Sequence, residues 1–340
     1  MKLRLLSTAL IILAAFASPA QAQTKLLFNM FWPPSFFMTP VMHQWAAEVE
    51  KATAGRVQIE FAAGSLAPPP QQLSGVQSGI FDISVAANPF IKNKAPLIEF
   101  SSLPWLIQDA EAASVAMWRT YEKKLAGKKQ FADVHLLSLF QSTGGELYSL
   151  SDTPIDSMNE LKSRKMWALP GEAADLLKSI GMNPITSPAV QITESVSRGV
   201  VDGYYGLSLD GAASFKATPY TKVVTLFPLA ATSTSFSLFI NKAKWASLSE
   251  QDRAAIMSVS GEKMAALVGR ASNKSATEAL AKMKADGIKV VYATPAFYTA
   301  MQKAAVPSFK QYEAIAAKHG VDGKAVIDYF KKQYAALAKP

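Results

Sequence analysis

The sequence predicts an α/β protein made of two similar lobes. Strands and helices alternate from Leu161 to Gly206, and the same β-α-β-α-β order occurs between Lys25 and Ala87. Alternation of this kind gives parallel strands in a sheet that helices cover. A helical pattern too long for one lobe follows Ser249. At 340 residues, the chain is long enough for two lobes and a sizeable core.

The stretch from Leu161 to Gly206 contains five predicted elements. They are a strand over Lys165–Leu169 closed by Pro170 and Gly171, a helix over Glu172–Ile180, an extended segment over Asn183–Thr186, a helix from Pro188 to Arg198 capped by Ser187, and a strand over Val200–Tyr205. Sheets of this class bind ligands outside the carboxyl ends of their strands. The ligand-contact candidates at or near those ends are Trp167, Leu169, Gln191, Tyr204 and Tyr205.

An aromatic turn follows the first predicted strand, Lys25–Phe31. Its apolar side chains need burial, and the loop after the first strand of an α/β lobe borders the ligand cleft. Trp32 and Phe36 are therefore candidates for the cleft, with packing on their own lobe as the alternative. Asn88, which directly follows the third predicted strand over Phe81–Ala87, is a further candidate.

Two glycines separate a pair of strands near the middle of the chain. A buried strand over Val134–Gln141 runs into Ser142–Gly145, and another strand covers Glu146–Leu150. Because glycine tolerates backbone rotation, this segment is predicted to be an interlobe hinge; an ordinary loop is the alternative. The long strand over Thr232–Asn241 is predicted to cross back.

The longest helical pattern runs from Glu250 to Asp286 and ends at Gly287. Unbroken, it would measure about 55 Å at 1.5 Å per residue. Gly261 and Gly269 are the positions where it is expected to bend. A strand over Ile288–Tyr292 and two helices complete the chain.

The first 22 residues have the features of a signal peptide. Lys2 and Arg4 precede an apolar run, and Ala20–Ala22 form an A-x-A cleavage signature. Cleavage after Ala22 would release a mature periplasmic protein, and no later stretch is long enough to span a membrane. An uncleaved membrane anchor is the alternative.

The chemistry that the chain lacks narrows its function. The absence of cysteine excludes disulfides, thiolate metal sites and Cys nucleophiles. The three histidines, His43, His135 and His319, lack metal-ligand spacing. The formal charge of +9 is spread over predicted helices without a dense basic run, which argues against nucleic acid as a partner. We therefore predict no catalytic residue, no metal and no cofactor: a binding protein and not an enzyme.

Several segments resemble one known family. They are "GRVQIEFAAGSLAPPPQQLSGVQSGIFDIS" at residues 55–84, "LPWL" at 103–106, "LKSRKMWALPG" at 161–171, "SVSRGVVDG" at 195–203 and "FINKAKWASLSEQDRAAI" at 239–256. Together, and in this order, they resemble the solute-binding proteins of TRAP transporters, the dicarboxylate-type periplasmic receptors. The resemblance implies a two-lobed periplasmic binding protein fold with mixed sheets, interlobe hinge strands and a long spine helix. It also implies a small organic acid as ligand and membrane permease subunits as partners.

The resemblance also suggests how the chain is divided. We expect a signal peptide over residues 1–22, the first segment of lobe I over 23–141, lobe II over 142–231 and a return segment to lobe I over 232–255. Residues 256–340 are expected to form the spine helix and the C-terminal helices, packed across both lobes.

The chain departs from the family at the expected ligand anchors. The family's carboxylate-binding Arg falls at Trp167, and Tyr204 and Tyr205 stand where a polar Asn is common. An indole cannot neutralise a carboxylate, so we predict a ligand whose aromatic or apolar body stacks on Trp167. Backbone N–H groups near Val190 and Gln191 would then hold any acid group. Two other functions remain open: presentation of ligand to a membrane sensor, and an exported enzyme.

Overall fold

The computed structural model describes residues 23–338, whose strands form two mixed sheets. The first sheet has the order β2-β1-β3-β10-β4. Its strands are β1 (Thr24–Asn29), β2 (Val57–Phe61), β3 (Ile83–Ala87), β4 (Val134–Gly145) and β10 (Thr232–Asn241). The second sheet has the order β11-β9-β5-β8-β6-β7. Its strands are β5 (Leu147–Ser149), β6 (Met166–Ala168), β7 (Ile185–Thr186), β8 (Gly203–Tyr205), β9 (Val223–Leu226) and β11 (Lys289–Tyr292).

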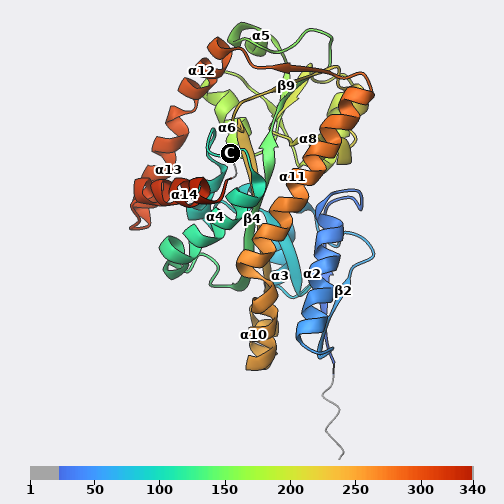
Figure 1. Ribbon diagram of the computed structural model, residues 1–340, viewed down its shortest axis with the longest axis vertical. Helices are drawn as coiled ribbons and strands as arrows, with labels where there is room; N and C mark the ends of the chain where they lie inside the picture. Colours follow the sequence, from blue (N-terminus) through green and yellow to red (C-terminus); the bar gives the residue numbers. More distant parts are fainter. Residues whose placement is uncertain (1–22, 339–340) are drawn as a thin grey trace, which may run out of the picture.

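We call the parts built on these sheets lobe I and lobe II (Figure 1). In lobe I, β1 runs parallel to β2 and β3, whereas β10 runs antiparallel to β3 and β4. In lobe II, β6 is parallel to β7 and β8, whereas β5 is antiparallel to β8 and β9. The predicted fold class, two lobes with mixed sheets, is confirmed.

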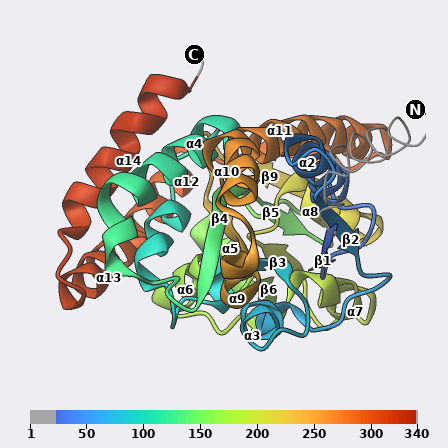
Figure 2. The ribbon, with the colours of Figure 1, turned by 90° about the horizontal axis from the view of Figure 1, so that it is seen from below.

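Helices cover both sheets. Those that precede β10 are α2 (Met38–Ala52), α3 (Gln72–Gln77), α4 (Ala110–Thr120), α5 (Met158–Ser163), α6 (Glu172–Ser179), α7 (Ile192–Ser197) and α8 (Leu209–Ser214). Those that follow β10 are α9 (Lys242–Ser247), α10 (Glu250–Val259), α11 (Gly261–Ala285), α12 (Pro295–Ala304), α13 (Val306–Lys318) and α14 (Gly323–Leu337). Viewed from below, α11 and α3 lie on opposite sides of the strands (Figure 2).

The chain passes between the sheets at the predicted Gly-Gly segment. β4 stays paired with β10 as far as Gly145, and β5 of lobe II begins at Leu147, so only Glu146 lies between the two sheets. The return passage lies between Leu226 and Thr232. The predicted lobe boundaries at residues 141 and 231 stay predictions.

The long helical segment is one bent spine, as expected. It breaks between α10 and α11, where Ser260 is extended (φ −102°, ψ −152°) and Gly261 adopts a φ of +54°. This left-handed conformation favours glycine. Gly269 lies within α11 without a break. α11 contacts α4 and β4 in lobe I and α8 and β11 in lobe II, so it links the two lobes (Figure 1).

One predicted helix begins differently in the structure. The segment after Ser187 forms a 3-10 turn, η7 (Ala189–Gln191), before α7, and Ser187 makes no capping bond. The Ser187 hydroxyl instead accepts a hydrogen bond of 3.0 Å from Trp167 Nε1. The predicted cap is therefore wrong: the Ser187 hydroxyl holds the Trp167 indole in place instead of capping a helix.

The predicted signal peptide lies outside the described residues. Within residues 23–338, none of the helices combines the length and the apolar character needed to cross a bilayer.

Candidate ligand-binding site

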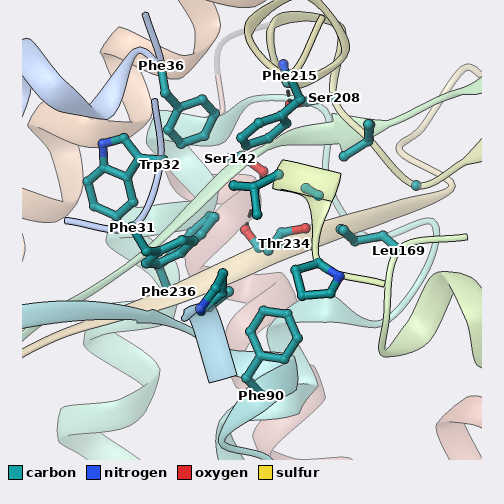
Figure 3. A pocket seen from close by; sticks show the side chains of 18 residues that line it. Phe31, Trp32, Phe36, Phe90, Ser142, Leu169, Ser208, Phe215, Thr234 and Phe236 are labelled. Carbon is teal, nitrogen blue, oxygen red and sulfur yellow. Dashed lines mark hydrogen bonds between the residues drawn. The ribbon is translucent and has the colours of Figure 1, made fainter. Parts of the chain in front are cut away.

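A largely apolar cavity lies between the two lobes (Figure 3). About 60 Å³ of it is open to the centres of water molecules, so little free space remains between the lobes in this conformation. The lining residues are Phe31, Trp32, Phe36, Pro69, Ala87, Phe90, Ser142, Leu169, Pro188, Ala189, Val190, Gly206, Leu207, Ser208, Gly211, Phe215, Thr234 and Phe236.

Lobe I contributes the aromatic turn that follows β1. Trp32 Nε1 donates a 3.0 Å hydrogen bond to Thr39 Oγ1 near the start of α2, which fixes the indole. Phe31 packs edge-on against Trp32, with ring centroids 5.0 Å apart. Trp32 and Phe36 are buried, so the turn presents a fixed aromatic wall to the cavity.

An aromatic pair joins the two lobes across the cavity. Phe36 of lobe I stacks on Phe215 of lobe II with ring centroids 5.3 Å apart and an interplanar angle of 28°. Next to it, Ser214 Oγ donates a 3.3 Å hydrogen bond to the Ser35 carbonyl. The lobes are therefore in contact at this edge.

The lobe II wall comes from segments that follow strand ends. Leu169 directly follows β6, and Gly206 directly follows β8. Gly206 has a φ of +97°, and a Cβ there would lie 2.5 Å from the Ala173 Cβ. Only glycine fits this close approach, which brings the chain from β8 to the cavity.

The crossing strands form the floor. Ser142 lies near the end of β4, and Thr234 and Phe236 lie on β10. Ser142 Oγ donates a 3.3 Å hydrogen bond to the Thr234 carbonyl. The same strands therefore connect the lobes and line the cavity.

Three of the predicted ligand contacts line this cavity: Trp32, Phe36 and Leu169. They come from both lobes and from two different strand ends, as the rule for α/β sheets predicts.

Trp167 lies in the core of lobe II and not in the cavity wall. Its side chain is fully buried and clusters with Ile192, Val196 and Tyr204. The prediction that alternation points Trp167 to the cleft is corrected: Trp167 faces the core, whereas Leu169, which lies just beyond the end of β6, lines the cavity. Helices and loops cover both faces of the sheet, so a large residue within β6 is core on either face.

The other candidates also lie outside the lining. Tyr204 stacks on Tyr148 at 4.2 Å, and its hydroxyl lies 2.7 Å from Thr221 Oγ1. The Tyr205 hydroxyl donates to the Ala231 carbonyl at 3.3 Å. Both tyrosines are fully buried, so their polar ends are used inside lobe II.

Asn88 and Gln191 adjoin the cavity without lining it. The Asn88 side chain bonds Ser235 and Ser237 of β10, at 2.9 and 2.6 Å, and ties β3 to β10. Gln191 is exposed at the end of η7, whereas Ala189 and Val190 of the same turn line the cavity.

The lining residues that the sequence did not predict include Phe90, Phe215, Thr234 and Phe236. Phe90 follows β3 in the same turn as Asn88, so the rule that located Asn88 would have found it. Phe215 follows a short helix, and β10 returns from a distant part of the chain, so no local sequence pattern marks their convergence.

A second cavity between the lobes has the opposite character. About 390 Å³ of it is open to the centres of water molecules, and its lining includes Lys92, Glu99, Glu172, Asp175 and His319. Burial raises the pKa of Glu99 to about 7 and that of Glu172 to about 8. Lys92 Nζ lies 3.6 Å from an oxygen of Asp175, an ion pair between the lobes.

Comparison with known proteins agrees with this architecture. A family model described as bacterial extracellular solute-binding protein, family 7, matches residues 28–315. TsaT from Comamonas testosteroni, described as an outer membrane transporter protein, is 35% identical over 333 residues, which cover 98% of each chain.

Two solved structures extend the comparison to the fold. A TRAP periplasmic solute-binding protein from Bordetella bronchiseptica, with bound (R)- and (S)-mandelate, is 27% identical with a TM-score of 0.88 over 93% of this chain and 100% of that one. A TRAP solute-binding protein from Rhodoferax ferrireducens, in complex with copurified benzoate, is 23% identical with a TM-score of 0.84 over 92% and 98% of the two chains. The second likeness is one of fold. The chain therefore belongs to the bacterial extracellular solute-binding proteins of family 7, the receptors of TRAP transporters, as its sequence motifs predict.

Proposed function

We propose that this protein captures a small organic solute with an aromatic or apolar body by closing its two lobes, and delivers it to the membrane permease subunits of a TRAP system. The observation that carries the proposal is the cavity between the lobes, walled by the aromatic turn of lobe I, Phe215 and Leu169 of lobe II, and the crossing strands. We place this function in the periplasm, after cleavage at Ala22.

An aromatic body is favoured by the composition of the wall. Six of the eighteen lining residues are aromatic: Phe31, Trp32, Phe36, Phe90, Phe215 and Phe236. Ring–ring contacts are worth about 0.5–1.5 kcal/mol each beyond the burial of apolar area. The ligands named for the similar TRAP proteins, mandelate and benzoate, also carry an aromatic ring.

Binding and closure are testable with four compounds: benzoate, mandelate and their amides, benzamide and mandelamide. We call these the aromatic panel. Isothermal titration should give one site per chain for at least one member, without chemical turnover. Small-angle scattering should show a smaller radius of gyration with that compound bound. Failure of every member to bind, together with native mass spectrometry showing no copurified small molecule, would overturn the proposal.

Delivery to a permease needs a test in cells. Uptake of the labelled panel member that binds should require both this protein and the permease subunits. Uptake that is unchanged when the permease genes are deleted would contradict delivery, while leaving the binding function intact.

A further inference from the structure

The candidate cavity has no charged lining residue, although similar proteins bind organic acids. Within residues 23–338, the side chains of its wall are apolar, aromatic or hydroxyl-bearing, and none is Lys, Arg, His, Asp or Glu. A carboxylate buried among such groups loses its hydration without gaining a counter-charge, at a cost of several kcal/mol. The wall therefore favours a ligand that brings no charge.

The arginines of the described chain are engaged elsewhere. Five of the six in residues 23–338 pair with an acid, and the sixth bonds backbone carbonyls. The pairs are Arg56 with Asp252, Arg119 with Glu262, Arg164 with Glu160, Arg198 with Glu194 and Arg270 with Glu111, and Arg253 bonds the carbonyls of Ala246 and Leu248. None lines the cavity, so the two-pronged carboxylate clamp that arginine supplies is missing from this wall.

The polar side chains of the wall, Ser142, Ser208 and Thr234, are hydroxyls, each with one proton to donate and two lone pairs that accept. Ser142 already donates its proton to the Thr234 carbonyl, which leaves its oxygen lone pairs for a ligand. Ser208 Oγ accepts a 3.3 Å hydrogen bond from the Gly211 N–H, so this N–H is occupied. Figure 3 shows Ser142 and Thr234 among the aromatic rings of the wall. A ligand hydroxyl or amide can both donate to and accept from such hydroxyls, whereas a carboxylate can only accept.

A buried acid lies directly behind the wall. Asp210 is 2% exposed and sits between the lining residues Ser208 and Gly211. The hydroxyls of Ser208 and Thr143 and the N–H groups of Asp210 and Gly211 lie close to its carboxylate and partly offset the effect of burial on its pKa. Burial raises the pKa of Asp210 to about 6, so the group is ionised at pH 8. In a poorly solvated site, this charge repels an anionic ligand.

From these observations we propose that the cavity selects an uncharged ligand: an aromatic or alicyclic body bearing a hydroxyl or amide that donates to the floor. The inference rests on the proposed function, because it assigns a ligand class to the same site. The proposed ligand class also differs from the organic acids named for similar proteins. Comparing the acid and the amide of the same aromatic compound therefore distinguishes the two ligand classes.

The test is calorimetry at pH 8 with the matched pairs benzoate/benzamide and mandelate/mandelamide. We expect the amide of each pair to bind about tenfold more tightly or better, because the ring contacts are shared and only the buried charge differs. Equal or tighter binding of the acids would overturn the inference and leave the proposed function standing. Absence of binding by all four compounds would overturn the inference, and it would overturn the proposed function as well if native mass spectrometry also showed no copurified small molecule.

Asp210→Asn supplies a second test within the same assay. It keeps the side-chain shape and removes the buried charge, so affinity for the acids should rise severalfold while affinity for the amides stays within about twofold. Asp202→Asn is the matched control, because Asp202 accepts a hydrogen bond from the Lys165 N–H at the far end of β6. An Asp210→Asn protein that melts normally and gains no acid affinity would contradict the role given to Asp210.

Discussion

The two cavities between the lobes differ in almost every physical property. One is walled by aromatic rings and carries no charged lining residue in the described chain, and the other is lined by three carboxyl groups, two lysines (Lys92 and Lys318) and His319. Apolar contacts depend little on pH and salt, whereas charged groups at an interface respond to both. We infer from this comparison that the two cavities have different roles: the apolar cavity selects the solute, and the charged cavity adjusts how readily the lobes close.

The largest expected effect comes from making the apolar cavity resemble the charged one. Leu169→Glu places a carboxylate in a wall without a counter-charge, which should cost about 3 kcal/mol of ligand binding, or more than about 100-fold in affinity. Calorimetry with the tightest member of the aromatic panel measures this loss.

Ile80→Glu is the matched control, because Ile80 is 59% exposed and lies outside the cavity wall. Binding should be unchanged in this variant. Comparable losses of affinity in both variants, or no loss in Leu169→Glu, would show that Leu169 does not contact the ligand.

A smaller loss should follow when the aromatic contact between the lobes is cut. Phe215→Ala removes the ring that stacks on Phe36, and we expect affinity to fall by about 1–2 kcal/mol through weaker closure and lost ring contact. Phe309→Ala, a half-buried ring on α13 outside the cavity, should leave affinity unchanged. An unaltered scattering difference between free and bound Phe215→Ala would show that the pair does not help closure.

The strand ends explain why the sequence located part of this site. Trp32, Phe36 and Leu169 were identifiable because they follow strands of a predicted α/β lobe, where ligands bind. Trp167 and the two tyrosines were misplaced because a strand buried on both faces gives no periodic signal for which side meets the ligand. Phe215 and Phe236 come from segments distant in the chain, and no local pattern records that they converge. The bend at Gly261 was predictable, since glycine within a long helix marks a local weakness.

The charged cavity predicts a pH dependence of ligand binding. The pKa of a free Glu is about 4.3, and burial raises the values for Glu99 to about 7 and Glu172 to about 8. We expect lobe opening to hydrate both groups and bring their pKa values towards that of a free Glu, so their protonated forms should favour the closed state, and this effect should be lost as the pH rises through 7 and 8. Affinity for benzamide, which does not titrate in this range, should fall severalfold between pH 6 and pH 9.

Glu172→Gln should flatten this profile, because the amide stays neutral at every pH. Glu194→Gln, which changes an exposed acid paired with Arg198, should keep the wild-type profile. A wild-type affinity that is constant or rises from pH 6 to pH 9 would contradict the role given to the charged cavity.

The smallest expected effect concerns the ion pair between the lobes. Lys92 and Asp175 are both more than a third exposed at a separation of 3.6 Å, and exposed pairs contribute about 0–1 kcal/mol. Lys92→Gln should therefore weaken binding less than threefold at low salt and have no effect at about 1 M salt. A large, salt-independent loss would mean that Lys92 acts through some other contact.

The central claim is that one small molecule with an apolar body binds in the cavity between the lobes. Native mass spectrometry of the wild-type protein, Leu169→Glu and Ile80→Glu, each mixed with the aromatic panel, tests it most directly. The account predicts one bound molecule per chain for the wild type and Ile80→Glu, and none for Leu169→Glu. Equal occupancy in all three proteins, or no bound molecule in any of them, would contradict it.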